Sequence, residues 1–194
     1  MEWEAETGRP PADAQSMPLS TVFEIHTVVR PFIEICMLKR RPQDLPTSTL
    51  LLGITLTTHT LASILLSTVT LEFWKALMAG IVDTLLVVVL SASLLFFYRL
   101  SARIPQTLMA MTGTGTVITL VALPLFSWSQ NAQQGDGSPF AALLVLGVIA
   151  WSLAVSGHIL RHALSVPYFL GIFIAFGFFW ISHSLFITLF PFGN

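Results

Sequence analysis

The sequence predicts an all-α membrane protein, a polytopic bundle of five transmembrane helices preceded by an amphipathic interfacial helix. Hydrophobic residues make up 54% of its 194 residues, charged residues only 10%, and the mean hydropathy is +0.79. Soluble domains carry about 25% charged residues, so this composition excludes an ordinary soluble domain. Apolar runs of about 20 residues recur along the chain, each long enough to cross a bilayer as a helix. These runs lack the alternation of apolar and polar residues that outer-membrane barrel strands show.

The first 41 residues divide into a polar tail and an amphipathic segment. Residues 1–18 are acidic and contain prolines, so we expect a flexible tail. Residues 19–41 carry apolar side chains at helical spacing, and a helix would place on one face Val22, Ile25, Val29, Phe32, Ile33 and Cys36. Because Lys39, Arg40 and Arg41 close this segment, we expect it to lie in the inner headgroup layer. The alternative is a docking surface for a cytoplasmic partner.

The remaining residues, 42–194, form the predicted transmembrane domain. Helices are the state expected for its apolar runs, because lipid offers no hydrogen-bond partners to an open backbone. We place the spans at residues 49–68, 74–98, 106–128, 140–164 and 168–190. Basic residues gather on one side of these spans, so the positive-inside rule predicts a cytoplasmic N-terminus and places the C-terminus on the opposite side. We expect the membrane to be a bacterial inner membrane, with the C-terminus in the periplasm. The basic residues expected to meet lipid headgroups on the inner side are Lys39, Arg40, Arg41, Arg99, Arg103 and Arg161.

Two ionisable residues, His59 and Asp83, fall inside neighbouring spans at nearly the same depth. At a rise of about 1.5 Å per residue, His59 lies about 15 Å and Asp83 about 18 Å from the inner boundary of a core about 30 Å thick. An unpaired Asp at mid-membrane costs about 2.5 to 3.5 kcal/mol, which predicts a partner in His59 or in nearby Thr and Ser hydroxyls. Three roles stay open for the pair: joining two helices, handling ions or protons, and contacting another subunit.

Small residues recur three or four positions apart in the third, fourth and fifth spans. They let helix backbones approach closely, and this packing replaces the hydrophobic drive inside lipid. We expect contacts between helices of this chain, or between copies of it, at Gly113, Gly115, Gly147, Ala150, Ala154, Gly157, Gly171 and Ala175.

Motifs for catalysis, metal binding and cofactor binding are missing from the sequence. It contains no HExxH, GxSxG or phosphate-binding glycine loop, and its single cysteine, Cys36, excludes an internal disulfide. Palmitoylation of Cys36 is conceivable, but we expect an unmodified thiol. A haem would need two histidines at matching depth, and His183, about 24 Å into its span, does not match His59; His26 and His158 remain as a conceivable pair. We therefore predict a non-enzyme without metal, cofactor or nucleic-acid partner.

Two short stretches add a family resemblance to this topology. "RPQDLPTS" at residues 41–48 precedes the first span, and "QTLMAMTGTGTVITLVALPL" at residues 106–125 forms a third span rich in small residues. With five spans and an amphipathic N-terminal segment, the chain resembles the Yip-type integral membrane proteins and their bacterial relatives. It departs from the eukaryotic pattern at residues 44–46, where Asp-Leu is followed by Pro. The resemblance implies a fold and a topology, and it assigns no functional residues.

These observations predict a non-enzymatic scaffold or accessory subunit of a membrane complex. Its partners would be the lipid bilayer and other membrane proteins, or a second copy of the chain. Small-residue helix faces and the missing catalytic motifs favour this role. The alternative is a small channel or transporter that uses His59 and Asp83.

Overall fold

The structure, a computed structural model, describes residues 29–46, 48–133 and 139–190. Within these ranges every regular element is a helix, and five helices are long and apolar enough to cross a membrane. The all-α fold with five membrane-length helices is thereby confirmed. In chain order, a helix over residues 29–36 is followed by η1 (Pro42–Asp44), α2 (Thr49–Ser67), α3 (Phe73–Phe97), η2 (Ser101–Arg103), α4 (Ile104–Gln133), α5 (Pro139–Leu164) and α6 (Tyr168–Leu189).

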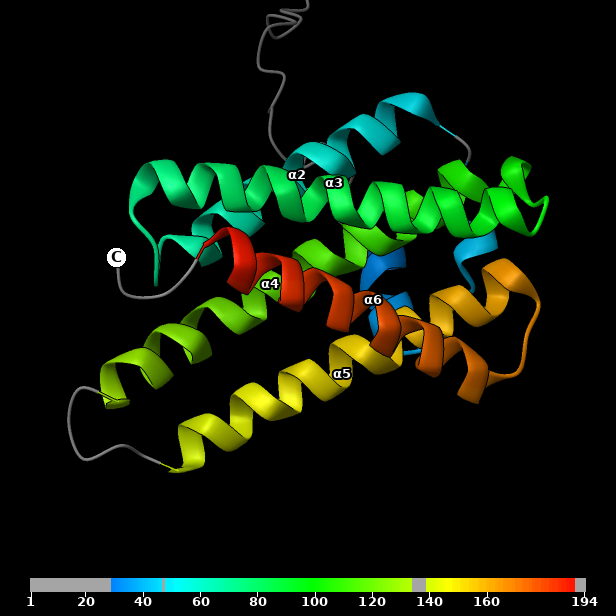
Figure 1. The fold of residues 1–194 in the computed structure, drawn as a ribbon. Coiled ribbons are helices and arrows are strands. Elements are labelled where there is room, and N and C mark those ends of the chain that lie inside the picture. Colours follow the sequence, from blue (N-terminus) through cyan, green and yellow to red (C-terminus); the bar gives the residue numbers. More distant parts are fainter. Residues whose placement is uncertain (1–28, 47, 134–138, 191–194) are drawn as a thin grey trace, which may run out of the picture.

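Helix α4 is the centre of the bundle. It packs against α2, α3 and α5, while α6 packs on α5 and touches α3, and Figure 1 shows α6 crossing between α3 and α5. The sequence of α4 suits this position, because small and hydroxyl-bearing residues dominate its buried part. Three buried threonines donate their hydroxyls to carbonyls four residues earlier in the chain, which keeps them hydrogen-bonded inside the bundle: Thr107, Thr112 and Thr114.

One end of the bundle, which we call the basic end, holds the turns from α3 to α4 and from α5 to α6 and the segment before α2. Three helices stop there at residues with positive φ: Leu38 (61°), Arg99 (58°) and Ser165 (58°). In each case the following residue donates its N–H to the carbonyl five positions earlier, as Lys39 does to Glu34. This Schellman arrangement satisfies carbonyls at the helix end, which offsets a strain of about 1 to 2 kcal/mol for a side chain in the left-handed region.

Residues 29–36, part of the segment expected to lie in the headgroup layer, pack against the helices of the bundle. Three of their side chains are buried: Phe32, Ile35 and Cys36. They belong to a core cluster that also includes Met109, Ala110, Val155 and Ile159. Phe32 lies against Gly113, where a Cβ would overlap its ring. Trp151 donates its indole N–H to the Cys36 carbonyl at 2.9 Å, which ties the end of this helix to α5.

The buried face of residues 29–36 also differs from the predicted face. Val29 and Ile33 are exposed, whereas Ile35 is fully buried. The recess at Gly113 holds the Phe32 ring, and this contact turns Ile35 instead of Ile33 toward the core. Residues 1–28, with the predicted tail and the first part of the amphipathic segment, lie outside the described residues.

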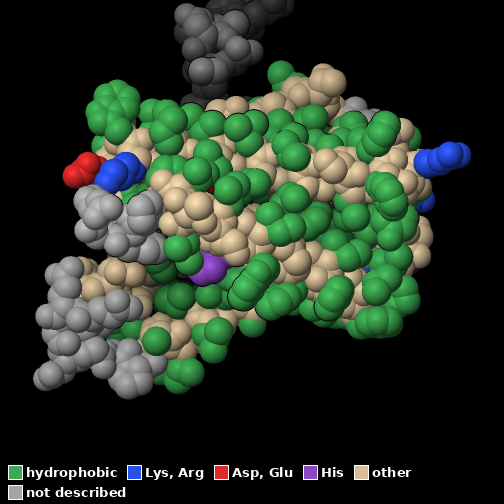
Figure 2. Space-filling view, in the orientation of Figure 1, with side chains coloured by type: hydrophobic (Ala, Val, Ile, Leu, Met, Phe, Trp, Pro, Cys, Tyr) green, Lys and Arg blue, Asp and Glu red, His purple; other side chains and the backbone are tan. Residues whose placement is uncertain are grey.

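Large apolar side chains cover the outer surface of the helices. Phe97 is 84% exposed, and others of the same kind include Leu50, Trp74, Phe96 and Phe173. Hydrophobic side chains cover most of the face shown in Figure 2, and acidic and basic side chains stand out at its two ends. An outer surface covered with so many exposed apolar side chains is suited to contact with lipid chains, as expected of an integral membrane protein.

Candidate functional site

A cavity of about 540 Å³ lies among helices α2 to α6, in the half of the bundle away from the basic end. Its wall reaches Thr70, beyond the last residue of α2, and Phe126 and Phe186 in the far halves of α4 and α6. The half near the basic end is filled by the core cluster around Phe32 and Met109. The bundle is therefore closely packed at the basic end and hollow toward the opposite end.

His59 and Asp83 meet in the wall of this cavity. The Ser63 hydroxyl donates to Oδ2 of Asp83 at 2.7 Å, and Nε2 of His59 lies 3.3 Å from the same oxygen. A second polar contact one turn away joins the same helices, because the Thr60 and Thr84 hydroxyl oxygens are 2.9 Å apart. The structure therefore brings the predicted pair together. Of these two contacts with the Asp83 carboxylate, the hydrogen bond from the Ser63 hydroxyl is the shorter.

The two members of the pair differ in exposure. The side chain of His59 is 7% exposed, whereas that of Asp83 is 42% exposed and lines the cavity. Neither ring nitrogen of His59 has a well-aligned hydrogen-bond partner among the described residues. A buried imidazole usually has a hydrogen-bond partner for its ring nitrogens. A molecule bound in the adjacent cavity would be placed to provide one for His59.

Gly115 on α4 makes room for the His59 ring. A Cβ at position 115 would lie 2.8 Å from Cε1 and 3.0 Å from Nδ1 of His59, closer than carbon atoms in van der Waals contact. Gly115 belongs to the small-residue stripe that the sequence assigned to helix packing, and in the structure it lies against the His59 side chain. Gly80, which the sequence reasoning missed, lies in the same way against Ile64 of α2.

Two hydroxyl groups in the wall of the cavity, those of Thr114 and Ser152, present hydrogen-bond acceptors. Thr114 donates its hydroxyl to the Ala110 carbonyl at 2.7 Å, and Ser152 donates to the Ile149 carbonyl at 2.8 Å. Their protons are used within their own helices, so the oxygen lone pairs remain available. Ser152 and Ser156, one turn apart on α5, both line the cavity. Their spacing in the sequence was a signal for this site that the sequence reasoning did not use.

His183 of α6 also lines the cavity, with its ring stacked on Phe179 at a centroid distance of 5.7 Å. The two histidines differ in their expected depth along the spans, and both nevertheless line this cavity. The cavity extends along the helices and so reaches side chains at different depths. Two histidines and one carboxylate therefore share the wall of one cavity.

The predicted small-residue stripe between α5 and α6 is only partly used within the chain. A Cβ at Gly157 would lie 2.9 Å from Cα of Ile172, and a Cβ at Gly171 would meet the Gly157 carbonyl. Ala175 is buried and Ala154 partly buried. Gly147 and Ala150 are exposed, and a Cβ at Gly147 would meet no atom within 4 Å.

Half of the predicted headgroup residues have partners within the chain. Arg103 donates to the carbonyls of Ala163, at 2.9 Å, and His162, at 3.4 Å, and so caps the C-terminus of α5. Arg40 pairs with Glu34, which also binds Arg30, and the Arg161 guanidinium lies over the Tyr168 ring. The Arg30 side chain bonded to Glu34 lowers the pKa of that carboxyl. The exposed members of the set are Lys39, Arg41 and Arg99.

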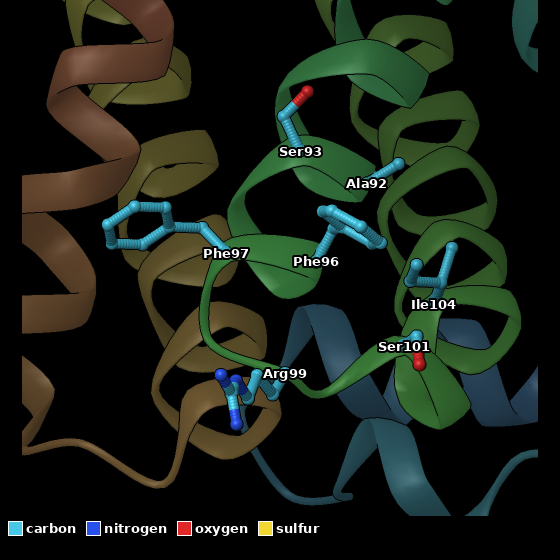
Figure 3. Close-up of a pocket in the computed structure, with 7 residues that line it drawn as sticks. All are labelled: Ala92, Ser93, Phe96, Phe97, Arg99, Ser101 and Ile104. Carbon is cyan, nitrogen blue, oxygen red and sulfur yellow. The ribbon is translucent and has the colours of Figure 1, made fainter.

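A second hollow, shallow and open, lies at the turn from α3 to α4 (Figure 3). Phe96 and Phe97 point to opposite sides of α3, and Arg99 lies below them at the turn. Its lining includes Ser93 and Ser101 but neither a carboxylate nor an imidazole. These residues are suited to contact with lipid, and the cavity at His59 and Asp83 is the better candidate for a functional site.

The chain matches no family model, no curated protein and no solved structure. Its resemblance to Yip-type proteins therefore stays a prediction from the sequence.

Proposed function

We propose that this membrane protein binds a small organic cation in the cavity among α2 to α6 and carries it across the membrane. The observation that carries the proposal is the Asp83 carboxylate, exposed to the cavity and contacted by Ser63 and His59. An ionisable group inside a membrane is expensive, and a functional role explains its presence.

The chemistry of the wall favours a cation over an anion. Besides Asp83, the groups that face the cavity include the acceptor oxygens of Thr114 and Ser152. Phe126, Phe179 and Phe186 also line the cavity, and aromatic rings attract cations. A volume of about 540 Å³ falls in the range of about 300 to 1,000 Å³ found for small-molecule sites. An amine of modest size satisfies the carboxylate, the hydroxyl oxygens and the aromatic rings together.

His59 lies beside the carboxylate that would receive the solute. Its Nε2 is 3.3 Å from Oδ2 of Asp83, so an incoming ammonium group approaches an oxygen that the imidazole already contacts. The solute must then pass the closely packed half of the bundle, where Phe32 and Met109 fill the path. Movement of residues 29–36 is the step that this mechanism requires at the basic end.

Three probes of equal size but different charge test the proposal: benzylammonium, benzyl alcohol and benzoate. Binding to the purified protein in detergent is measured by titration calorimetry, and uptake is measured in liposomes with an imposed pH difference. We expect benzylammonium to bind best, and Asp83→Asn to weaken it about tenfold or more, because a charged hydrogen bond is worth about 1.5 to 3 kcal/mol. Glu72→Gln is the matched control, since Glu72 is an exposed carboxylate at the start of the same helix.

Two outcomes would count against the proposal. One is equal affinity for benzylammonium and benzoate, which would show that the carboxylate does not select charge. The other is benzylammonium affinity in Asp83→Asn equal to that of the wild type. A folded Asp83→Asn protein, judged by its elution and melting temperature, makes either result decisive.

A second candidate function, a scaffold or accessory subunit, is supported by one surface. Gly147 and Ala150 lie exposed on α5 with open space beside Gly147, so a helix of another protein or of a second copy has room to approach there. Gly147→Ile fills that space without a clash inside the chain. Loss of an assembly on sizing in mild detergent would support this role, and an unchanged monomer for both proteins would exclude it.

A further inference from the structure

We propose that a polar hollow at the basic end binds a phosphate group, carried by an anionic phospholipid. The hollow has a volume of about 470 Å³ and lies between η1 and the turn from α5 to α6. It is separate from the cavity at Asp83, which lies in the other half of the bundle. The polar side chains that line it belong to Arg41, Gln43, Arg161, His162, Ser165 and Tyr168.

Two arginines face this hollow without an acidic partner in the described part of the chain. The guanidinium of Arg161 lies 5.6 Å from the centre of the Tyr168 ring, and the side chain of Arg41 is exposed. The carboxylate of Asp44, two residues beyond Pro42, accepts the backbone N–H of Arg41 at 3.3 Å. The two guanidinium groups therefore leave a net positive charge in the hollow.

Arg103 binds backbone carbonyls at the end of α5 that would otherwise repel an anion in the hollow. Its guanidinium donates to the carbonyls of His162 and Ala163, and Gln43 donates to the His162 carbonyl at 3.0 Å. The negative end of the α5 dipole is thereby covered. Arg103 also donates to Oγ of Ser165 at 3.0 Å, so the Ser165 hydroxyl keeps its own proton for a ligand.

The donors in the hollow are those that phosphate prefers. Guanidinium groups offer paired N–H donors that match phosphate oxygens, and a serine hydroxyl supplies a further donor. The cavity at Asp83 differs chemically, because a carboxylate lines it and two of its hydroxyls, those of Thr114 and Ser152, donate within their own helices and present lone pairs. The paired guanidinium groups of the hollow suit an anion, and the carboxylate of the cavity suits a cation.

The position of the hollow favours a lipid as the carrier of the phosphate. It lies at the start of α6, a membrane-length helix, and Phe169 beside it is 70% exposed. A phosphate in the hollow would leave acyl chains along this apolar surface, as basic pockets at helix ends bind anionic headgroups. The inference is independent of the proposed transport of cations.

Native mass spectrometry of the full-length protein in detergent tests this inference, with phosphatidylglycerol and phosphatidylcholine as probes. We expect wild-type protein to retain one phosphatidylglycerol in preference to phosphatidylcholine, whose choline group the arginines repel. Arg41→Gln and Arg161→Gln should each weaken retention about fivefold, since one basic residue contributes about 1 kcal/mol to anionic lipid binding. Arg99→Gln is the matched control, an exposed arginine at the same end but outside the hollow.

Three results would overturn the inference. Equal retention of the two lipids would remove the charge preference, and an equal loss in Arg99→Gln would reduce it to general surface charge. Binding of inorganic phosphate with displacement of phosphatidylglycerol would assign the hollow to a soluble phosphate instead. If Arg161→Gln unfolds because it loses Tyr168, the exposed Arg41→Gln carries the test.

Discussion

Replacing Gly115 by alanine tests whether this glycine exists to seat the His59 ring. The added Cβ would lie 2.8 Å from Cε1 of His59, so the ring must move by several tenths of an ångström or more. His59 is buried and Nε2 is already 3.3 Å from Asp83, so a shift of this size breaks the pair. Overpacking of this kind costs about 1 to 3 kcal/mol.

The measurement is the melting temperature in detergent together with benzylammonium affinity. A domain of this size loses about 2 to 4 °C per kcal/mol, so Gly115→Ala should melt about 2 to 12 °C lower and bind the amine less well. Gly147→Ala is the matched control, because the added methyl group there meets no atom within 4 Å. We expect Gly147→Ala to stay within about 0.5 kcal/mol of the wild type.

A double-mutant cycle isolates the contact between positions 115 and 59. His59→Ala removes the ring that the new methyl group would meet, so adding Gly115→Ala to it should cost little or nothing. The reasoning is refuted if Gly115→Ala has the same melting temperature as Gly147→Ala and keeps its affinity for benzylammonium. It is equally refuted if Gly115→Ala costs the same with and without the His59 ring.

Three further predictions concern the basic end and the orientation. Arg103→Gln should lower stability by about 1 to 2 kcal/mol, measured by thermal unfolding, because the α5 carbonyls lose a charged donor; an unchanged melting temperature would contradict the cap. Burial raises the pKa of Cys36 to about 11, so at pH 8 a maleimide should label it far more slowly than it labels glutathione, and rapidly after unfolding; rapid labelling of the folded protein would contradict this burial. In intact cells a membrane-impermeant maleimide should label Thr70→Cys and spare Ser101→Cys if the basic end is cytoplasmic, and the reverse result would invert the orientation.

Most of the fold could be predicted from the sequence, because a transmembrane helix can be recognised from a short stretch of sequence alone. An apolar run of about 20 residues has one stable state in lipid, whatever its neighbours are. The predicted span 140–164 and the observed α5, Pro139–Leu164, accordingly agree closely. The surroundings of residues 29–36 were harder to predict, since an amphipathic helix gains a similar free energy by placing its apolar face on lipid or on protein. The recess at Gly113 decides in favour of protein.

The candidate site could be predicted in part, through depth. His59 and Asp83 stand at matching depth on helices joined by a short turn, and they lie 3.3 Å apart in the structure. Arg103 shows the limit of the same reasoning. Its charge pointed to a lipid headgroup, but the end of α5 lies within reach and binds it through two carbonyls.

By itself, the sequence determined the fold class, the number of membrane-length helices and the position of each polar side chain along its helix. These follow from composition and from a fixed rise per residue, and both are properties of one helix at a time. The tertiary structure alone decided the cavity, its sharing by His59 and His183, the seat of His59 on Gly115 and the burial of Ile35. These depend on the rotation of each helix about its axis, which is set by the contacts of small residues with side chains from distant parts of the chain.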